Sequence, residues 1–135
     1  MKAIADTGLL VALVRANDQY HQWAADIGAQ IQWPVLTCEA VLAETAFHLE
    51  SSRQVLEMLR DSVVRVAFDC ESNLDHLYSL AARYADRKPD LADLCLIRMS
   101  ELFPRHTVIT VDEEDFRVYR RNKREAIPLL CPPKK

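Results

Sequence analysis

The 135 residues include only two glycines, and several kinds of segment are missing from the chain. No repeat or low-complexity stretch is present, which argues against a flexible linker between domains. No apolar run approaches the roughly 20 residues that a membrane-spanning helix needs. The start, Met1-Lys2, lacks the charged region and apolar core of a signal peptide. We therefore expect one cytoplasmic domain over residues 1–135, with no membrane association.

Several chemical motifs are also absent. The four cysteines, Cys38, Cys70, Cys95 and Cys131, form no C-x-x-C pair and no cluster with zinc spacing. This scatter predicts buried or idle thiols in a reducing compartment. No Walker A or G-x-G-x-x-G sequence occurs, and no Ser-His-Asp or Cys-His set has a recognisable context.

Strand patterns alternate with helical patterns along the whole chain. Strands are expected over residues 3–5, 33–37, 63–68, 107–110 and 127–130, with helices between them. In one helix, Leu74, Leu77, Tyr78, Ala81 and Ala85 recur at helical spacing, which predicts a buried stripe. This order favours an α/β fold with a parallel sheet of about five strands and helices on both faces.

Charge is distributed unevenly. Residues 1–116 hold 10 basic and 19 acidic side chains, whereas residues 117–135 hold 7 basic side chains against Glu125 alone. The C-terminal segment is either a solvated basic tail or a surface for phosphate groups. The candidates for contacts with a nucleic-acid backbone are Arg117, Arg120, Arg121, Lys123 and Arg124.

Acidic residues recur at the ends of the expected strands and at helix starts. Asp6 ends the first strand, Asp112 follows the fourth with Asp115 three residues on, and Asp90 and Asp93 open a helix. In open α/β sheets, ligands bind at the carboxyl ends of the strands. Thr7 and Gly8 suit a tight turn that aims Asp6 at a shared site.

One more acid, Glu44, lies inside a helix among apolar neighbours, where an ionised group is costly unless it is paired or binds a cation. Taken singly, the other acids have simpler explanations: Asp6 and Asp90 can cap helices, and Asp112 to Asp115 can form a solvated turn. Taken together, such acids repel one another unless a divalent cation such as Mg²⁺ or Mn²⁺ joins them. Such a site activates water and stabilises a departing oxyanion.

Four segments in order resemble the PIN domain, most closely the VapC-type toxins of toxin–antitoxin pairs. They are Asp6-Thr7-Gly8-Leu9-Leu10-Val11-Ala12-Leu13, Ala40-Val41-Leu42-Ala43-Glu44, Asp90-Leu91-Ala92-Asp93 and Thr110-Val111-Asp112-Glu113-Glu114-Asp115-Phe116. The resemblance implies a three-layer PIN-like fold with strand order 3-2-1-4-5. It also implies a ribonuclease that uses Mg²⁺ or Mn²⁺.

The same resemblance assigns roles to individual residues. Asp6, Glu44, Asp93 and Asp112 would form the catalytic and metal-binding site, with Asp115 assisting and Thr110 hydrogen-bonding to the ligands. Thr7 in the turn and Asp90 as a helix cap are expected to support the site. The resemblance also implies a homodimer inhibited by a small antitoxin protein, for which Leu10, Val14, Trp23 and Phe47 are groove candidates or core residues. Leu94-Cys95 and Glu113-Glu114 depart from the family pattern without removing an expected ligand.

Two other functions are consistent with parts of the sequence. A PIN-like fold could serve as a binding module for RNA or protein with negligible catalysis. A phosphohydrolase of the haloacid dehalogenase type needs a second acid two residues after its nucleophile, where this chain has Gly8. The metal-dependent ribonuclease is the leading hypothesis.

Overall fold

Five short strands build one parallel sheet in the computed structural model, which describes residues 1–134. The strands are β1 (Ala3–Ala5), β2 (Val35–Thr37), β3 (Val64–Val66), β4 (Thr107–Ile109) and β7 (Leu129–Leu130), in the order β3-β2-β1-β4-β7. Each pair of neighbours is parallel, and Ile4 in the central strand pairs with Leu36 and Val108. The expected α/β class with a five-stranded parallel sheet is confirmed.

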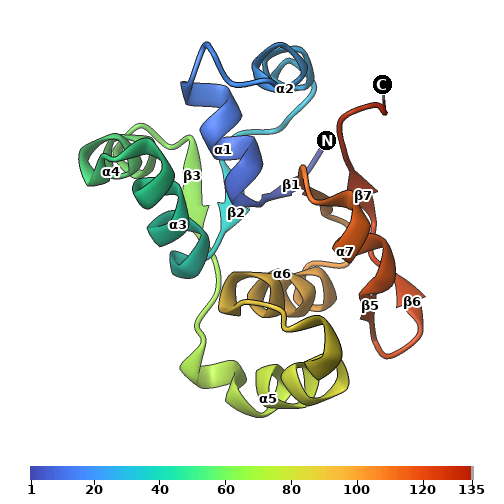
Figure 1. Ribbon diagram of the computed structural model, residues 1–135. Coiled ribbons are helices and arrows are strands. Elements are labelled where there is room, and N and C mark those ends of the chain that lie inside the picture. The colour runs from blue at the N-terminus through green and yellow to red at the C-terminus, as the bar shows by residue number, and fades with distance from the viewer. Residues whose placement is uncertain (135) are drawn as a thin grey trace.

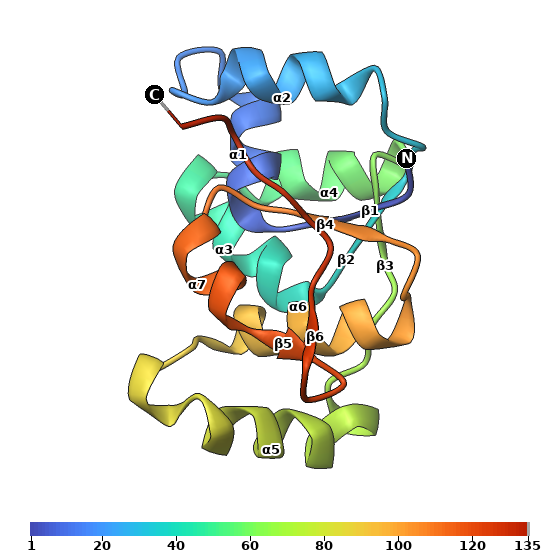
Figure 2. The ribbon, with the colours of Figure 1, turned by 90° about the vertical axis from the view of Figure 1, so that its right-hand side faces the viewer.

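Helices flank this sheet. They are α1 (Thr7–Val14), α2 (His21–Gly28), α3 (Glu39–Leu49), α4 (Ser52–Arg60), α5 (Leu74–Arg83), α6 (Leu91–Leu102) and α7 (Glu113–Val118), with short 3-10 turns η1 (Glu71–Asn73) and η2 (Ala85–Arg87). In the two ribbon views, α1 and α2 lie above the strands, whereas α6 and then α5 lie below them (Figures 1 and 2). Among the described residues, every helix is too short or too polar to cross a bilayer.

A small hairpin follows α7 that the sequence patterns did not predict. Strands β5 (Arg120–Arg121) and β6 (Glu125–Ala126) pair antiparallel outside the main sheet. Asn122 and Lys123 at its turn both have positive φ angles. A strand of two residues is too short to show the alternation of apolar and polar side chains that predicts a strand. The sequence patterns therefore predicted only a basic segment and one strand over residues 117–130.

The hydrophobic core is largest around the central strands and α6. Ile4 and Val108 from the sheet, and Leu96 and Ile97 from α6, are fully buried, and Leu94 and Cys95 are also core residues. The stripe expected on α5 is partly wrong, because Leu74 and Tyr78 are 62% and 76% exposed. Leu77 is buried as expected, but Leu80 and Tyr84 are buried in place of Leu74 and Tyr78, so the helix is rotated relative to the expected stripe.

Gly8 has a different role from the one expected. It lies inside α1 and has no positive φ angle, so it does not form the turn after Asp6. A Cβ atom at this position would lie 2.4 Å from Cγ2 of Val111. The missing side chain therefore lets the start of α1 approach the loop after β4, which brings the neighbourhoods of Asp6 and Asp112 together.

Candidate active site

Six acidic residues line one open pocket of about 330 Å³, and five of them were singled out from the sequence. Asp6 follows β1, Glu44 lies on α3, Asp90 and Asp93 are at the start of α6, and Asp112 follows β4. The pocket is also lined by Thr7, Gly8, Val11, Asp18, Gln19, Tyr20, His48 and Val111. The convergence arises because β1 and β4 are parallel neighbours, so both strands end at the same edge of the sheet.

Asp6 both caps α1 and faces the other acids. Its Oδ1 accepts a 2.7 Å hydrogen bond from the Thr7 amide, and its Oδ2 accepts a 2.6 Å bond from the Thr110 hydroxyl. Burial raises the pKa of this carboxyl, and these two bonds act in the opposite direction. Asp112 and Asp90 raise the pKa further through charge repulsion. The capping role and the site role, which the sequence left as alternatives, coexist in this residue.

Glu44 reaches the pocket from α3. Its Oε2 accepts a 3.2 Å hydrogen bond from the hydroxyl of Thr7, the residue next to Asp6. Burial raises the pKa of Glu44, and the charges of Asp90 and Asp6 raise it further. Thr7 thus links the third helix to the start of the first.

Asp93 reaches the pocket from the first turn of α6. Burial, followed by the charges of Asp90 and Asp6, raises its pKa to about 8. Oδ1 of Asp90 accepts a 2.8 Å bond from the Asp93 amide, so the expected N-cap at Asp90 is present. The Tyr119 hydroxyl donates a 3.0 Å bond to Oδ2 of Asp93 and thereby orients that side chain.

Asp112 and Asp115 complete a group of three acids with Asp93. One carboxylate oxygen from each lies within 4.8 Å of the others. Burial raises the pKa of Asp112 despite the bond that it accepts from the Asp115 amide. Arg87 in η2 donates a 3.0 Å bond to Oδ1 of Asp115, so one oxygen of that acid already has a cationic partner.

The donor set fits a hard divalent cation such as Mg²⁺ or Mn²⁺. Every candidate ligand is a carboxylate oxygen, which these ions prefer. Burial first, and then repulsion from neighbouring acids, raises the pKa of Asp6, Asp93 and Asp112. The group of three contains Asp93, Asp112 and Asp115, while Asp6 and Glu44 lie on the same pocket outside that group.

Two residues at this site were missed by the sequence patterns. Tyr119 was expected only as an apolar anchor, yet its hydroxyl holds Asp93. Arg87 was not expected to contact an acid 28 residues away along the chain. Neither belongs to a motif with the residue that it contacts, so only the folded chain reveals these contacts.

The expected RNA-backbone residues differ in accessibility. Arg121 is 7% exposed, and its guanidinium donates to the carbonyls of Ser100 and Pro104 and to Glu125. Arg121 is therefore structural, contrary to expectation. The guanidinium of Arg120 donates to the backbone carbonyls of three residues, Arg117 and Val118 at the end of α7 and Tyr119 after it. Arg117 forms an ion pair with Glu113.

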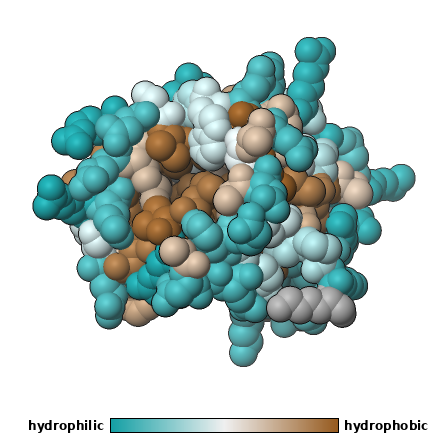
Figure 3. Space-filling view, turned by 90° about the horizontal axis from the view of Figure 1, so that it is seen from above, coloured by the Kyte–Doolittle hydropathy of each residue, from teal (hydrophilic) through white to brown (hydrophobic). Residues whose placement is uncertain are grey.

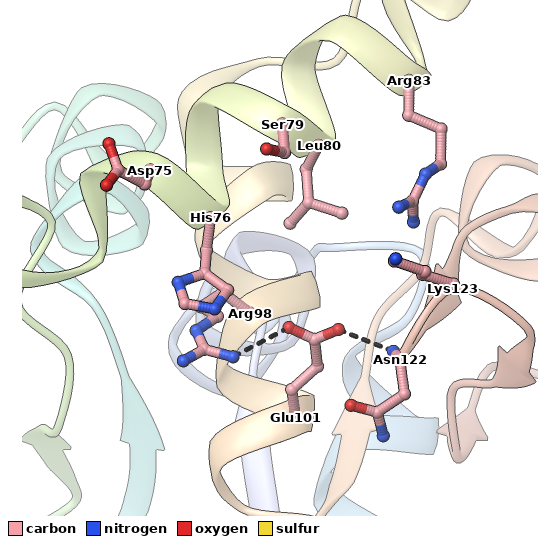
Figure 4. Close-up of a pocket in the computed structure, with 9 residues that line it drawn as sticks. All are labelled: Asp75, His76, Ser79, Leu80, Arg83, Arg98, Glu101, Asn122 and Lys123. Atoms are coloured by element: carbon pink, nitrogen blue, oxygen red, sulfur yellow. Dashed lines mark hydrogen bonds and ion pairs between the residues drawn. The ribbon is translucent and has the colours of Figure 1, made fainter.

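Lys123 and Arg124 are exposed at the hairpin turn. Lys123 lines a second pocket, where it faces Arg83 of α5 across the opening (Figure 4). In the same pocket, Glu101 is held by Arg98 and by the amide of Asn122. One pocket thus carries two basic side chains, Lys123 and Arg83, that the sequence patterns did not bring together.

Comparison of the sequence with protein-family models and with curated proteins gave no match.

Proposed function

We propose that this chain is a divalent-metal-dependent endoribonuclease of the PIN type, acting as the toxin of a toxin–antitoxin pair. The observation that carries the proposal is the convergence of Asp6, Glu44, Asp93 and Asp112 on one pocket at the carboxyl edge of a parallel sheet. These are the four acids that the resemblance assigns to the site. The observed strand order, β3-β2-β1-β4-β7, is also compatible with the order that the resemblance implies, if β7 is taken as the fifth strand.

The metal would be held by Asp93 and Asp112, with Asp115, Asp6 and Glu44 as further oxygen donors around the pocket. When bound, Mg²⁺ or Mn²⁺ polarises a water molecule and offsets the negative charge that develops on a phosphodiester during hydrolysis. In the PIN-type reaction, water attacks phosphorus and the bond to the 3′ oxygen breaks, which leaves a 5′-phosphate and a 3′-hydroxyl.

The chain's own residues position these acids. The Thr110 hydroxyl donates to Asp6 and accepts from the Asp112 amide, so a single oxygen connects two of them. Thr7 holds Glu44, and Tyr119 holds Asp93. Burial and the neighbouring charges raise the pKa of Glu44, and a carboxylate with a raised pKa accepts a proton more readily, which suits Glu44 to receive the proton of the attacking water.

The test is cleavage of RNA by the full chain in Mg²⁺ or Mn²⁺. Glu44→Gln and Asp6→Asn should each lower the cleavage rate by about 100-fold or more, because each removes a carboxylate from the site. Glu39→Gln is the matched control, since Glu39 lies on the same helix, is exposed and does not line the pocket. Cleavage that survives EDTA and Asp6→Asn unchanged would exclude the proposal.

A catalytically weak binding module is the second candidate. It is favoured by the number of acids already paired within the chain, namely Asp6 with Thr110, Glu44 with Thr7, Asp93 with Tyr119 and Asp115 with Arg87. Titration with Mn²⁺ separates the two functions. A ribonuclease should bind the ion in a way that Asp93→Asn abolishes, whereas a module of this kind should show no such binding.

Exposed apolar side chains support a protein partner, either an antitoxin or a second copy of the chain. Phe47 on α3 is 79% exposed and Leu56 on α4 is 62% exposed, whereas Leu10, another groove candidate, is fully buried. The face that carries α1 and α2 shows hydrophobic side chains gathered between hydrophilic ones (Figure 3). Lys123 and Arg124 are the accessible candidates for the RNA backbone.

A further inference from the structure

Two cysteines that are 25 residues apart in the chain meet beside α6. The Sγ atoms of Cys70 and Cys95 lie 3.4 Å apart. Cys70 immediately precedes η1 and is exposed, whereas Cys95 is in the middle of α6 and is fully buried. Both are free thiols, so the pair combines one sulfur that solvent reaches with one that only its neighbour reaches.

We propose that Cys70 and Cys95 form a reversible disulfide, and that Cys70 is the site of attack on a low-molecular-weight disulfide such as oxidised glutathione. The sulfur atoms are already close to contact distance. A disulfide bond is about 2 Å long, so the thiols need to approach by little more than about 1 Å. Cys70 lies in a surface turn beside the three-residue η1, where such a movement disturbs little regular structure.

The chemistry balances without any further oxidant. The Cys70 thiolate attacks one sulfur of oxidised glutathione, which breaks that disulfide and releases one glutathione thiolate. Sγ of Cys95 then attacks Sγ of Cys70, and its proton passes to the departing sulfur, which releases the second glutathione as a thiol. Two protein thiols are oxidised to one disulfide, and one glutathione disulfide is reduced to two thiols.

The other two cysteines are poorer partners. Cys38 interacts with the Cys95 thiol but is 1% exposed, so an oxidant reaches neither sulfur of that pair directly. Cys131 lies after β7, near Glu113 and Arg117 of α7. Cys131 is therefore a suitable control position, because it is partly exposed and lies apart from the Cys70–Cys95 pair.

The disulfide would connect the turn before α5 to the middle of α6. It would close a loop that contains α5, η2 and the first turn of α6, including Asp93 two residues before Cys95. Closing a loop of this size restricts the unfolded chain, so the oxidised form should unfold at a higher temperature than the reduced form. This property does not depend on the proposed ribonuclease activity.

The experiment treats the full chain with oxidised glutathione and digests it with trypsin without a reductant. The expected product is residues 66–83 joined to residues 88–98, which are the tryptic peptides that contain Cys70 and Cys95. The thermal midpoint should rise by several degrees and return to its starting value after dithiothreitol. Cys131→Ser should behave like the parent chain, whereas Cys70→Ser should form no internal disulfide.

Several outcomes would overturn the inference. These are a stable glutathione adduct on Cys70 without a cross-link, a cross-link between Cys38 and Cys95, a disulfide between two chains, or no loss of thiols. Because Cys70 is exposed, Cys70→Ser should fold normally, and its unchanged thermal midpoint under reducing conditions checks this. None of these measurements uses RNA, so their failure is separable from failure of the proposed function.

Discussion

At the scale of single residues, the Thr110 hydroxyl has the most connected position in the site. It is buried, donates 2.6 Å to Oδ2 of Asp6 and accepts 3.0 Å from the amide of Asp112. It therefore joins the acid after β1 to the acid after β4. Groups that orient metal ligands in this way commonly affect affinity by 10- to 100-fold.

We expect Thr110→Val to lower Mn²⁺ affinity and RNA cleavage by about 10- to 100-fold, because valine keeps the shape but removes both hydrogen bonds. Thr110→Ser keeps the hydroxyl and should retain most of both. Isothermal titration with Mn²⁺ and single-turnover cleavage measure the two effects. Equal loss in the valine and serine variants would show that the hydroxyl alone does not account for the effect.

At the scale of elements, the site depends on how closely α1 approaches the loop after β4. Gly8 is in contact with this loop at a place where a Cβ would lie 2.4 Å from Val111 Cγ2 and 3.2 Å from its Cβ. The methyl groups of Val111 are thus the main obstacle to a larger residue at position 8. This contact predicts a specific compensation between the two positions.

Gly8→Ala should destabilise the fold by about 1–3 kcal/mol, the usual cost of overpacking, although alanine favours a helix. Val111→Ala should relieve most of the clash, so that the double variant is more stable than the sum of the single changes predicts. Urea denaturation of the four proteins measures this coupling. Additive effects would show that the close approach of α1 to Val111 is not the reason for glycine at position 8.

The β5–β6 hairpin divides the basic residues into structural and accessible ones. Arg121 is buried and bonded to Ser100 and Pro104, whereas Lys123 and Arg124 are exposed at the turn. Arg121 should therefore stabilise the fold, whereas Lys123 and Arg124 should interact with phosphate groups.

Lys123→Ala combined with Arg124→Ala should weaken RNA binding and reduce its dependence on salt concentration by about one to two released counterions. The same double variant should leave the thermal midpoint nearly unchanged. Arg121→Ala should instead lower the thermal midpoint, because it leaves buried carbonyl groups without their partner. Filter binding over a range of salt concentrations, with thermal denaturation of each variant, distinguishes these outcomes.

At the scale of the whole molecule, the acidic edge makes stability depend on pH. Burial and neighbouring charges raise the pKa of Asp93 from its ordinary 3.8 to about 8 in the folded chain. Between these values the folded state binds more protons than the unfolded state, so this group's stabilising contribution decreases as pH rises through the window. The raised pKa values of Asp6, Glu44 and Asp112 act in the same direction.

Without a divalent cation, we expect the thermal midpoint to decrease between about pH 4 and about pH 8. Mn²⁺ should restore much of the loss at the higher pH, because a cation offsets the repulsion among the ionised carboxylates. Asp93→Asn should show a shallower pH dependence and a smaller effect of Mn²⁺. A pH profile identical to that of the parent chain would place the source of the dependence elsewhere.

The strand ends and helix starts could be predicted from sequence because local chemistry dictates them. Asp6, Asp90 and Asp112 each cap a helix with their own side chains, and short-range spacing reveals such positions. The stripe on α5 was partly wrong because which face a helix buries depends on its neighbour. Exposed Leu74 and Tyr78 are compatible with helical periodicity, and only packing against α6 selects Leu77 and Leu80.

By itself, the sequence determined the α/β class, the five strands of the parallel sheet and the acids at their ends, because period, capping and charge are local properties. Only the tertiary structure decided which groups meet. It placed Tyr119 on Asp93, Arg87 on Asp115, Arg121 in the interior, and Cys70 beside Cys95. The three contacting pairs, Tyr119–Asp93, Arg87–Asp115 and Cys70–Cys95, are separated by 25 to 28 residues along the chain. No local pattern encodes such contacts, because they follow from the packing of whole helices.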